Sequence, residues 1–186
     1  MGYAEQLQQV SNQLATLIQT SQSKYVVPYM GESVGFCTQT AIFFISAVAA
    51  VGLIYQSGKQ ARIRALLDLM MKQKTDLPLI AATHRVLELK TNGELLSKHA
   101  IKDSDERKEI LLVLNNLEFI AVGIRLKAFD ENVYKESQYS NLIRIWNACS
   151  GFVSELRNST GKKTIFQDLE FLAKKWEAKP IKNINK

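Results

Sequence analysis

The sequence predicts an all-α fold in which one transmembrane helix is followed by a small cytosolic helical bundle. The chain has 186 residues, enough for one domain of ordinary size. Residues 33–58 form a run of 26 residues without a charged side chain. The rest of the chain repeats apolar residues at helical spacing, and it shows no alternating apolar and polar residues bounded by hairpin turns.

Residues 1–32 are predicted to form a short extracytoplasmic amphipathic segment. Its apolar residues recur at spacings of 4, 3, 4 and 3, which is a heptad pattern: Tyr3, Leu7, Val10, Leu14 and Leu17. This pattern predicts a helix that either lies on the membrane or a neighbouring protein, or self-associates. Pro28 and Gly31 predict a break between this helix and the run that follows.

The uncharged run, residues 33–58, predicts the transmembrane helix. About 20 helical residues cross the roughly 30 Å hydrocarbon core of a bilayer. A buried helix of a soluble protein is a weaker reading, because such helices usually carry a charged face. Ala47-Val48-Ala49 has the spacing of a signal-peptidase site, but the 32 residues before the run lack the short basic start of a signal peptide.

Basic residues near the two ends of the run predict its orientation. Five follow it closely, namely Lys59, Arg62, Arg64, Lys72 and Lys74, whereas Lys24 alone precedes it. Residues 1–32 hold one Lys and two Glu, net −1, and residues 59–186 hold 23 Lys and Arg against 16 Asp and Glu, net +7. The positive-inside rule therefore predicts an N-terminus outside the membrane and a cytoplasmic C-terminus.

Residues 59–179 are predicted to form the cytosolic bundle. In chain order the expected helices are one that continues the span to about Asp76, one from Pro78 to Lys90, a short piece over 94–99, one over 103–126, one from Asp130 to Gly161 and one from Thr164 to Trp176. Asp103-x-x-Glu106 and Thr164-x-x-Gln167 resemble capping boxes. Residues 180–186 are predicted to be a flexible tail.

The sequence carries no recognisable catalytic signature. Its two histidines and two cysteines are not spaced as metal ligands, and it has no phosphate loop, dinucleotide fingerprint or nucleophile elbow. Cys149 fits a small core residue better than a nucleophile. We therefore expect no enzyme activity, no cofactor and no metal site.

One stretch, Leu114 to Arg125, stands apart from the helical background. Glu118 and Arg125 share a helical face with apolar residues, and Asn115 lies one turn before Glu118. A buried polar network between helices is the favoured interpretation, and a ligand or catalytic pocket is the alternative. Gly123 suggests close approach of a crossing helix.

The same stretch carries a resemblance. Its pattern Leu-Asn-x-x-Glu-x-Ile-Ala-x-Gly-Ile-Arg, followed by Phe129-Asp-Glu, Trp146 and Phe171-Leu-Ala-Lys-Lys-Trp176, resembles an uncharacterised family of bacterial and phage-borne domains. Members have a single membrane helix followed by a helical domain, and the similarity covers roughly residues 50–177. The resemblance implies a bacterial inner (plasma) membrane location and assigns no activity.

The sequence predicts the bilayer, together with protein partners or further copies of the chain, as binding partners. Lys59, Arg62 and Arg64 follow the span directly, where anionic headgroups attract basic residues. Ser46 and Ala50 form a small-x-x-x-small pair that allows helix association. Basic and acidic residues alternate elsewhere, which argues against nucleic-acid binding. The leading hypothesis is a membrane-tethered, non-enzymatic interaction or regulatory module; the alternative is a phage or prophage superinfection-exclusion or anti-phage defence factor, suggested by the resemblance alone.

Overall fold

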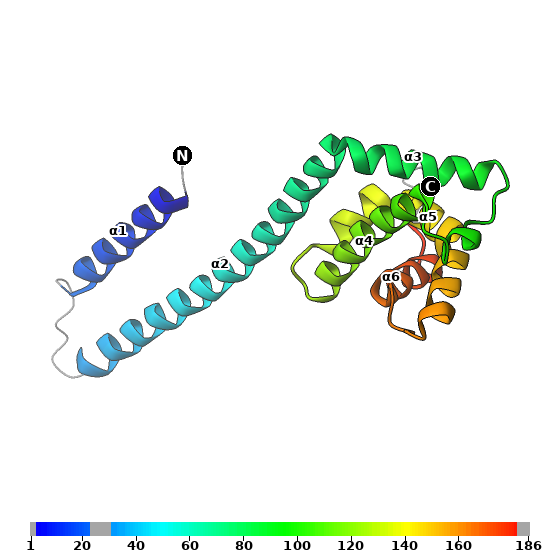
Figure 1. Ribbon diagram of the computed structural model, residues 1–186. Coiled ribbons are helices and arrows are strands. Elements are labelled where there is room, and N and C mark those ends of the chain that lie inside the picture. Colours follow the sequence, from blue (N-terminus) through cyan, green and yellow to red (C-terminus); the bar gives the residue numbers. More distant parts are fainter. Residues whose placement is uncertain (1–2, 23–30, 182–186) are drawn as a thin grey trace. The chain divides into compact units, whose positions relative to one another are not determined.

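The computed structural model describes residues 3–22 and 31–181, and all regular structure in these residues is helical. In chain order the elements are α1 (Tyr3–Gln22), α2 (Gly31–Thr75), α3 (Leu77–Thr91), the 3₁₀ helix η1 (Leu96–His99), α4 (Asp105–Arg125), α5 (Glu131–Thr160) and α6 (Gln167–Ala178) (Figure 1). The chain divides into two compact units, Met1–Ser57 and Gly58–Lys186. The predicted all-α class, with a long apolar helix followed by a helical region, is confirmed.

The first unit contains α1 and the beginning of α2. The helix α1 covers the predicted amphipathic segment, and Val10 and Leu17 on it are exposed. From Thr38 on, α2 is long and apolar enough to cross a membrane, and its most apolar 18 residues have a mean hydropathy of 1.7 and are not buried. The predicted break at Pro28 lies outside the described residues.

The helix α2 continues without interruption into the second unit, as the sequence predicts (Figure 1). Its last turns there join the bundle: Leu66 is fully buried, and Gln73 Nε2 donates to Asn116 Oδ1 of α4 at 3.0 Å. Asp76 then caps α3 by accepting from the N–H of Leu79 at 3.0 Å, with Pro78 in the first turn of that helix.

The N-terminal cap of α4 differs from the predicted one. Ser104, and not Asp103, occupies the cap, and its Oγ accepts from the N–H of Arg107 at 3.3 Å. A capping box would need Glu or Gln at position 107, where the chain has Arg107. The two candidate caps are adjacent acceptors, and the sequence pattern favoured the wrong one.

The two ends of α5 agree with prediction. Asp130 Oδ1 accepts from the N–H groups of Asn132 and Val133 at 3.0 and 3.1 Å. Gly161 follows the helix with φ of 70°, the left-handed conformation in which glycine is least strained. For α6, in contrast, Thr164 is not the cap: the cap position belongs to Phe166, which offers no side-chain acceptor.

The core of the second unit is formed by one face of each helix. Buried apolar side chains come from α3, α4, α5 and α6, together with Leu66 of α2. Trp176 of α6 lies at its centre and contacts the rings of Tyr134 and Tyr139, with centroids 5.9 and 6.2 Å away. Cys149 is fully buried, and this burial raises the pKa of its thiol to about 12, so the thiol is inert.

Substitutions at Leu66 and Leu67 should show which face of α2 packs against the bundle. Leu66→Ala should lower the free energy of unfolding by about 2–5 kcal/mol, because it leaves a cavity in the core. The matched control Leu67→Ala, where the side chain is 47% exposed, should cost within about 0.5 kcal/mol. The only two tryptophans, Trp146 and Trp176, lie buried in the second unit, so tryptophan fluorescence of the detergent-solubilised full chain measures unfolding there. Equal costs for the two variants would contradict the packing of α2 against the bundle.

Candidate functional site

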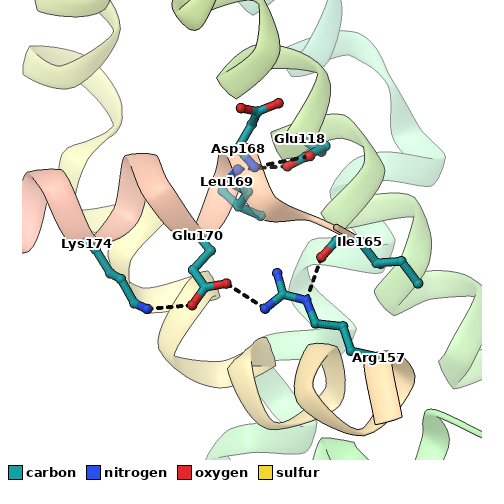
Figure 2. Close-up of polar contacts among 7 residues, drawn as sticks. All are labelled: Glu118, Arg157, Ile165, Asp168, Leu169, Glu170 and Lys174. Atoms are coloured by element: carbon teal, nitrogen blue, oxygen red, sulfur yellow. Dashed lines mark hydrogen bonds and ion pairs between the residues drawn. The ribbon is translucent and has the colours of Figure 1, made fainter. Parts of the chain in front are cut away.

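Glu118 of α4 caps the N-terminus of α6. Its Oε2 accepts from the N–H of Leu169 at 2.7 Å, and its Oε1 accepts from the N–H of Asp168 at 3.3 Å (Figure 2). These are the second and third residues of α6, whose N–H groups a cap side chain normally satisfies. Glu118 therefore replaces the oxygen that Phe166 lacks, from a position about 50 residues earlier in the chain.

The environment of Glu118 changes its acidity. Partial burial raises the pKa of the Glu118 carboxyl above its ordinary value, and the N–H groups of Leu169 and Asp168 act in the opposite direction. The nearby carboxylate of Asp168 raises the pKa further, whereas the guanidinium of Arg157 lowers it. Desolvation dominates, so the folded protein binds a proton at Glu118 more readily than the unfolded chain does.

Arg125 reaches the same turn of α6. Its Nε lies 2.7 Å from Asp168 Oδ1, and the Arg125 side chain is 54% exposed while that of Asp168 is 12% exposed. Water therefore screens one side of this ion pair, which limits its contribution to stability. Glu118 and Arg125 do not contact each other here; both contact residues in the first turn of α6.

Arg157 of α5 holds the same helix from another side. Its Nε donates to the carbonyl of Ile165 at 2.8 Å, and its Nη1 donates to Glu170 at 2.6 Å (Figure 2). Lys174 donates to the other oxygen of Glu170 at 2.6 Å. The Lys174 ammonium and the Arg157 guanidinium hold the pKa of the Glu170 carboxyl below its ordinary value. Sequence patterns gave no sign of Asp168, Arg157 or Glu170, because their partners lie on other helices.

Asn115 does not join this network. It is exposed on α4, whereas its neighbour Asn116 is half-buried and accepts the hydrogen bond from Gln73 of α2. The two amides differ by 100° around the helix, which is enough to place one on the surface and the other against α2. The structure therefore brings Glu118 and Arg125 together at α6 and leaves Asn115 apart.

Gly123 has a different neighbour from the expected crossing helix. The ring of Phe129, from the turn after α4, lies where a Cβ on Gly123 would stand. The carbonyl of Gly123 also accepts from the N–H groups of Ala128 and Phe129, at 2.8 and 3.2 Å. The glycine is needed because the chain folds back on the end of its own helix.

The three basic residues predicted to lie next to the membrane are on α2, at the start of its portion in the second unit. Lys59 and Arg64 are exposed and Arg62 is half-buried. Among the described side chains none of the three forms an ion pair with an acidic residue, so their charges face solvent.

The outward face of α4 is apolar, which the sequence analysis did not predict. Leu112, Phe119 and Leu126 recur every seven residues and are 41%, 59% and 64% exposed. The buried face of α4 uses other positions, including Ile110, Leu114 and Leu117. The sequence pattern contained this information: α4 has apolar residues on two faces, and a helix that packs against a core with one face needs only one apolar stripe.

The acidic, histidine and cysteine side chains that the structure describes do not gather into a metal site. No group of three or more His, Cys, Asp or Glu residues suited to a metal ion occurs among them. His99, in the segment between α3 and α4, has its Nε2 2.9 Å from Glu94 of the same segment and its Nδ1 4.0 Å from Glu106 in the first turn of α4. The arrangement around α6 can hold helices in place; it has the contacts of a structural network.

Comparison with known proteins identifies the family. The family model described as a domain of unknown function (DUF4760) matches residues 40–176. The match covers well over half of the 186 residues, so the chain belongs to this family. This agrees with the resemblance to an uncharacterised family. No curated protein and no solved structure gave a match.

Removing the acceptor at Glu118 should weaken the docking of α6. Glu118→Ala should lower the free energy of unfolding by about 1–2 kcal/mol, the usual cost of losing a helix cap. Glu118→Gln should cost less, because its amide oxygen still accepts one N–H. Arg125→Ala should cost less than about 1 kcal/mol, because its ion pair is half-exposed. Tryptophan fluorescence melts of the full chain in detergent measure all three; Glu118→Ala equal to wild type would reject the capping role.

Two carboxylates should give opposite pH dependences. The pKa of Glu170 is lowered on folding, so its stabilisation is present above the unfolded-state value of about 4.3 and is lost as pH falls through the folded value. The pKa of Glu118 is raised, so its contribution is present below that unfolded-state value and is lost as pH rises through the folded value.

Glu170→Gln should therefore lower the free energy of unfolding most at neutral pH. For Glu118→Gln, the free energy of unfolding should rise relative to that of wild type as the pH rises from acid to neutral. Urea titrations at a series of pH values measure both differences. If the difference in unfolding free energy from wild type changed with pH in the same direction for both variants, the opposite pKa shifts would be wrong.

Proposed function

We propose that this member of the DUF4760 family is a membrane-tethered, non-enzymatic interaction or regulatory module whose helical bundle lies in the cytosol. One observation carries the proposal: a single helix, α2, includes a stretch suited to lipid and residues that complete a folded core. Its apolar window is unburied, and Leu66, farther along the same helix, is fully buried. An unburied apolar helix surface is stable in hydrocarbon and costly in water.

The side chains of the second unit support binding rather than catalysis. Glu118, Arg125 and Arg157 come from two different helices, and all three contact α6 or the turn before it. The outward face of α4 instead presents Leu112, Phe119 and Leu126. Exposed apolar faces of this kind are typical of protein contact surfaces.

The charge distribution supports the orientation. Lys59, Arg62 and Arg64 follow the apolar stretch of α2, where a cytoplasmic leaflet rich in anionic lipid would attract them. We therefore place the chain in a bacterial inner membrane as a single-pass protein, with α1 outside and the bundle in the cytoplasm. The predicted division into residues 1–32, 33–58, 59–179 and 180–186 follows from this orientation.

A phage-exclusion or defence factor at the inner membrane would use the same architecture. The resemblance to phage-borne domains supports this second reading, and no described side chain favours it over a host partner. Deleting the gene and challenging the host with a broad phage panel separates the two. Changed infection supports exclusion or defence, and unchanged infection supports the host partner.

Cysteine labelling of intact cells should report the orientation. In a Cys37→Ser background, Gln13→Cys should react with a membrane-impermeant maleimide, and Lys162→Cys should react only after the cells are lysed. Both positions are exposed, so access depends on the side of the membrane and not on packing. The native Cys149 can stay as an internal control, because it is buried and its thiol does not ionise near neutral pH.

The reverse labelling pattern would overturn the orientation. Labelling of both sites in intact cells would show that the apolar helix does not separate them across a membrane. Extraction of the unlabelled chain by alkaline carbonate, without detergent, would also contradict a spanning α2.

A further inference from the structure

We infer that the partner bound by α4 is a second copy of this chain, with the two α4 helices packed antiparallel. This inference rests on the proposed function and names the partner of the same surface. We define the α4 seam as the six residues that lie on the outward side of the helix: Lys108, Leu112, Asn115, Phe119, Val122 and Leu126. Four of the six are apolar, and none is fully buried.

The spacing of the α4 seam is that of a helix–helix interface. Its residues follow one another at intervals of 4, 3, 4, 3 and 4, the heptad spacing that keeps side chains facing a partner helix. The series reads the same in both directions. A two-fold axis at the level of Leu117 therefore pairs every residue of the α4 seam with another member of it.

This register gives three kinds of layer, each occurring twice. Leu112 faces Val122 of the second copy, Phe119 faces Asn115, and Leu126 faces the aliphatic stem of Lys108. The ring of Phe129 extends the apolar surface at one end, since it contacts the ring of Phe119 with centroids 6.0 Å apart. Asn115, which is exposed and does not contact α6, would lie in this interface.

Charge complementarity selects the antiparallel arrangement. Residues 103–109 hold four acidic and two basic side chains, net −2, whereas residues 125–129 hold Lys127 and Arg125, which also pairs with Asp168, and no acid. Antiparallel packing brings the acidic end of each α4 beside the basic end of the other. Parallel packing would bring like charges together and would also align the two helix dipoles. Asp105 pairs with Lys108 of its own helix at 2.9 Å, but its side chain is 91% exposed, and in this arrangement it would face the exposed Lys127 of the other copy at each end.

A shared membrane favours this contact over capture of an unrelated protein. Two tethered copies meet in a thin layer, which raises their effective concentration without any new contact. The α4 seam also complements itself in residue spacing and charge, which a two-fold symmetric interface requires. A heterologous partner would need its own matching pattern.

Disulfide cross-linking tests the register directly. The full chain, in a Cys37→Ser background and in membranes, carries Leu112→Cys with Val122→Cys, or either change alone. The double variant should form a reducible dimer through 112–122 pairs, which cannot close within one helix because ten residues separate them by about 15 Å. The single variants should stay monomeric, because the two copies of either residue are offset by the same distance along the axes.

The outcomes discriminate. No dimer from any variant, or equal dimer from a single variant, overturns the antiparallel contact; the second result is the one that parallel packing or random collision gives. Phe119→Asp added to the double variant should abolish the dimer. The matched control Leu95→Asp, at a residue that is 61% exposed and off the α4 seam, should leave it intact.

Unchanged tryptophan fluorescence shows that both aspartate variants are folded. Loss of the dimer with Leu95→Asp as well would overturn the role of the α4 seam. Failure here leaves the labelling result for the proposed orientation unaffected, and a reversed labelling pattern leaves the cross-linking result unaffected, so the two proposals fail separately.

Discussion

Closure of the bundle depends on how the first N–H groups of α6 are satisfied. A helix that starts against other helices cannot leave these donors unpaired, because a buried unpaired N–H costs about as much as a lost hydrogen bond. Phe166 stands at the cap and is buried, so it contributes apolar contact in place of an oxygen. Glu118 provides the oxygen from α4 at the cost of partial desolvation, which the raised pKa records. This docking also positions Trp176, which lies two turns after Leu169 in α6 and is fully buried.

The side chains of α2 suit two different environments along one continuous helix. Its backbone groups are paired along its own length wherever it lies, so the side chains alone decide which environment suits each part. Before residue 58 the described side chains include large apolar groups such as Phe43, Phe44 and Ile54, all exposed. After it the pattern becomes amphipathic: Leu66 enters the core, Leu69 and Met70 pack partly against it, and charged residues take the remaining face. The change in pattern, and not a change in secondary structure, marks where the exposed apolar stretch ends and the protein core begins.

Sequence patterns predicted the helices well, because local rules determine them. Asp76, Asp130 and Gly161 act within one turn of their own positions, and each marks a helix end in the structure. The candidate site was harder, because Glu118 and Asp168 are 50 residues apart and their contact exists only once α4 packs on α6. The contact of Asn116, and not of the predicted Asn115, depends on where α2 packs against α4, and the role of Gly123 depends on a turn that folds back on α4. None of these contacts has a spacing that a linear pattern could report.

The two sides of α4 explain why a surface carries the proposed function. Charged residues toward α6 are committed to holding that helix, so they are not free to act on a substrate without loosening the fold. The opposite side has no such task, yet it keeps large apolar residues that would be expected to be polar on a helix with one core-facing stripe. Water penalises that exposure, and a contact with another protein removes the penalty without changing the bundle. The binding surface that we propose therefore lies where the core does not need it, on the outward face of α4.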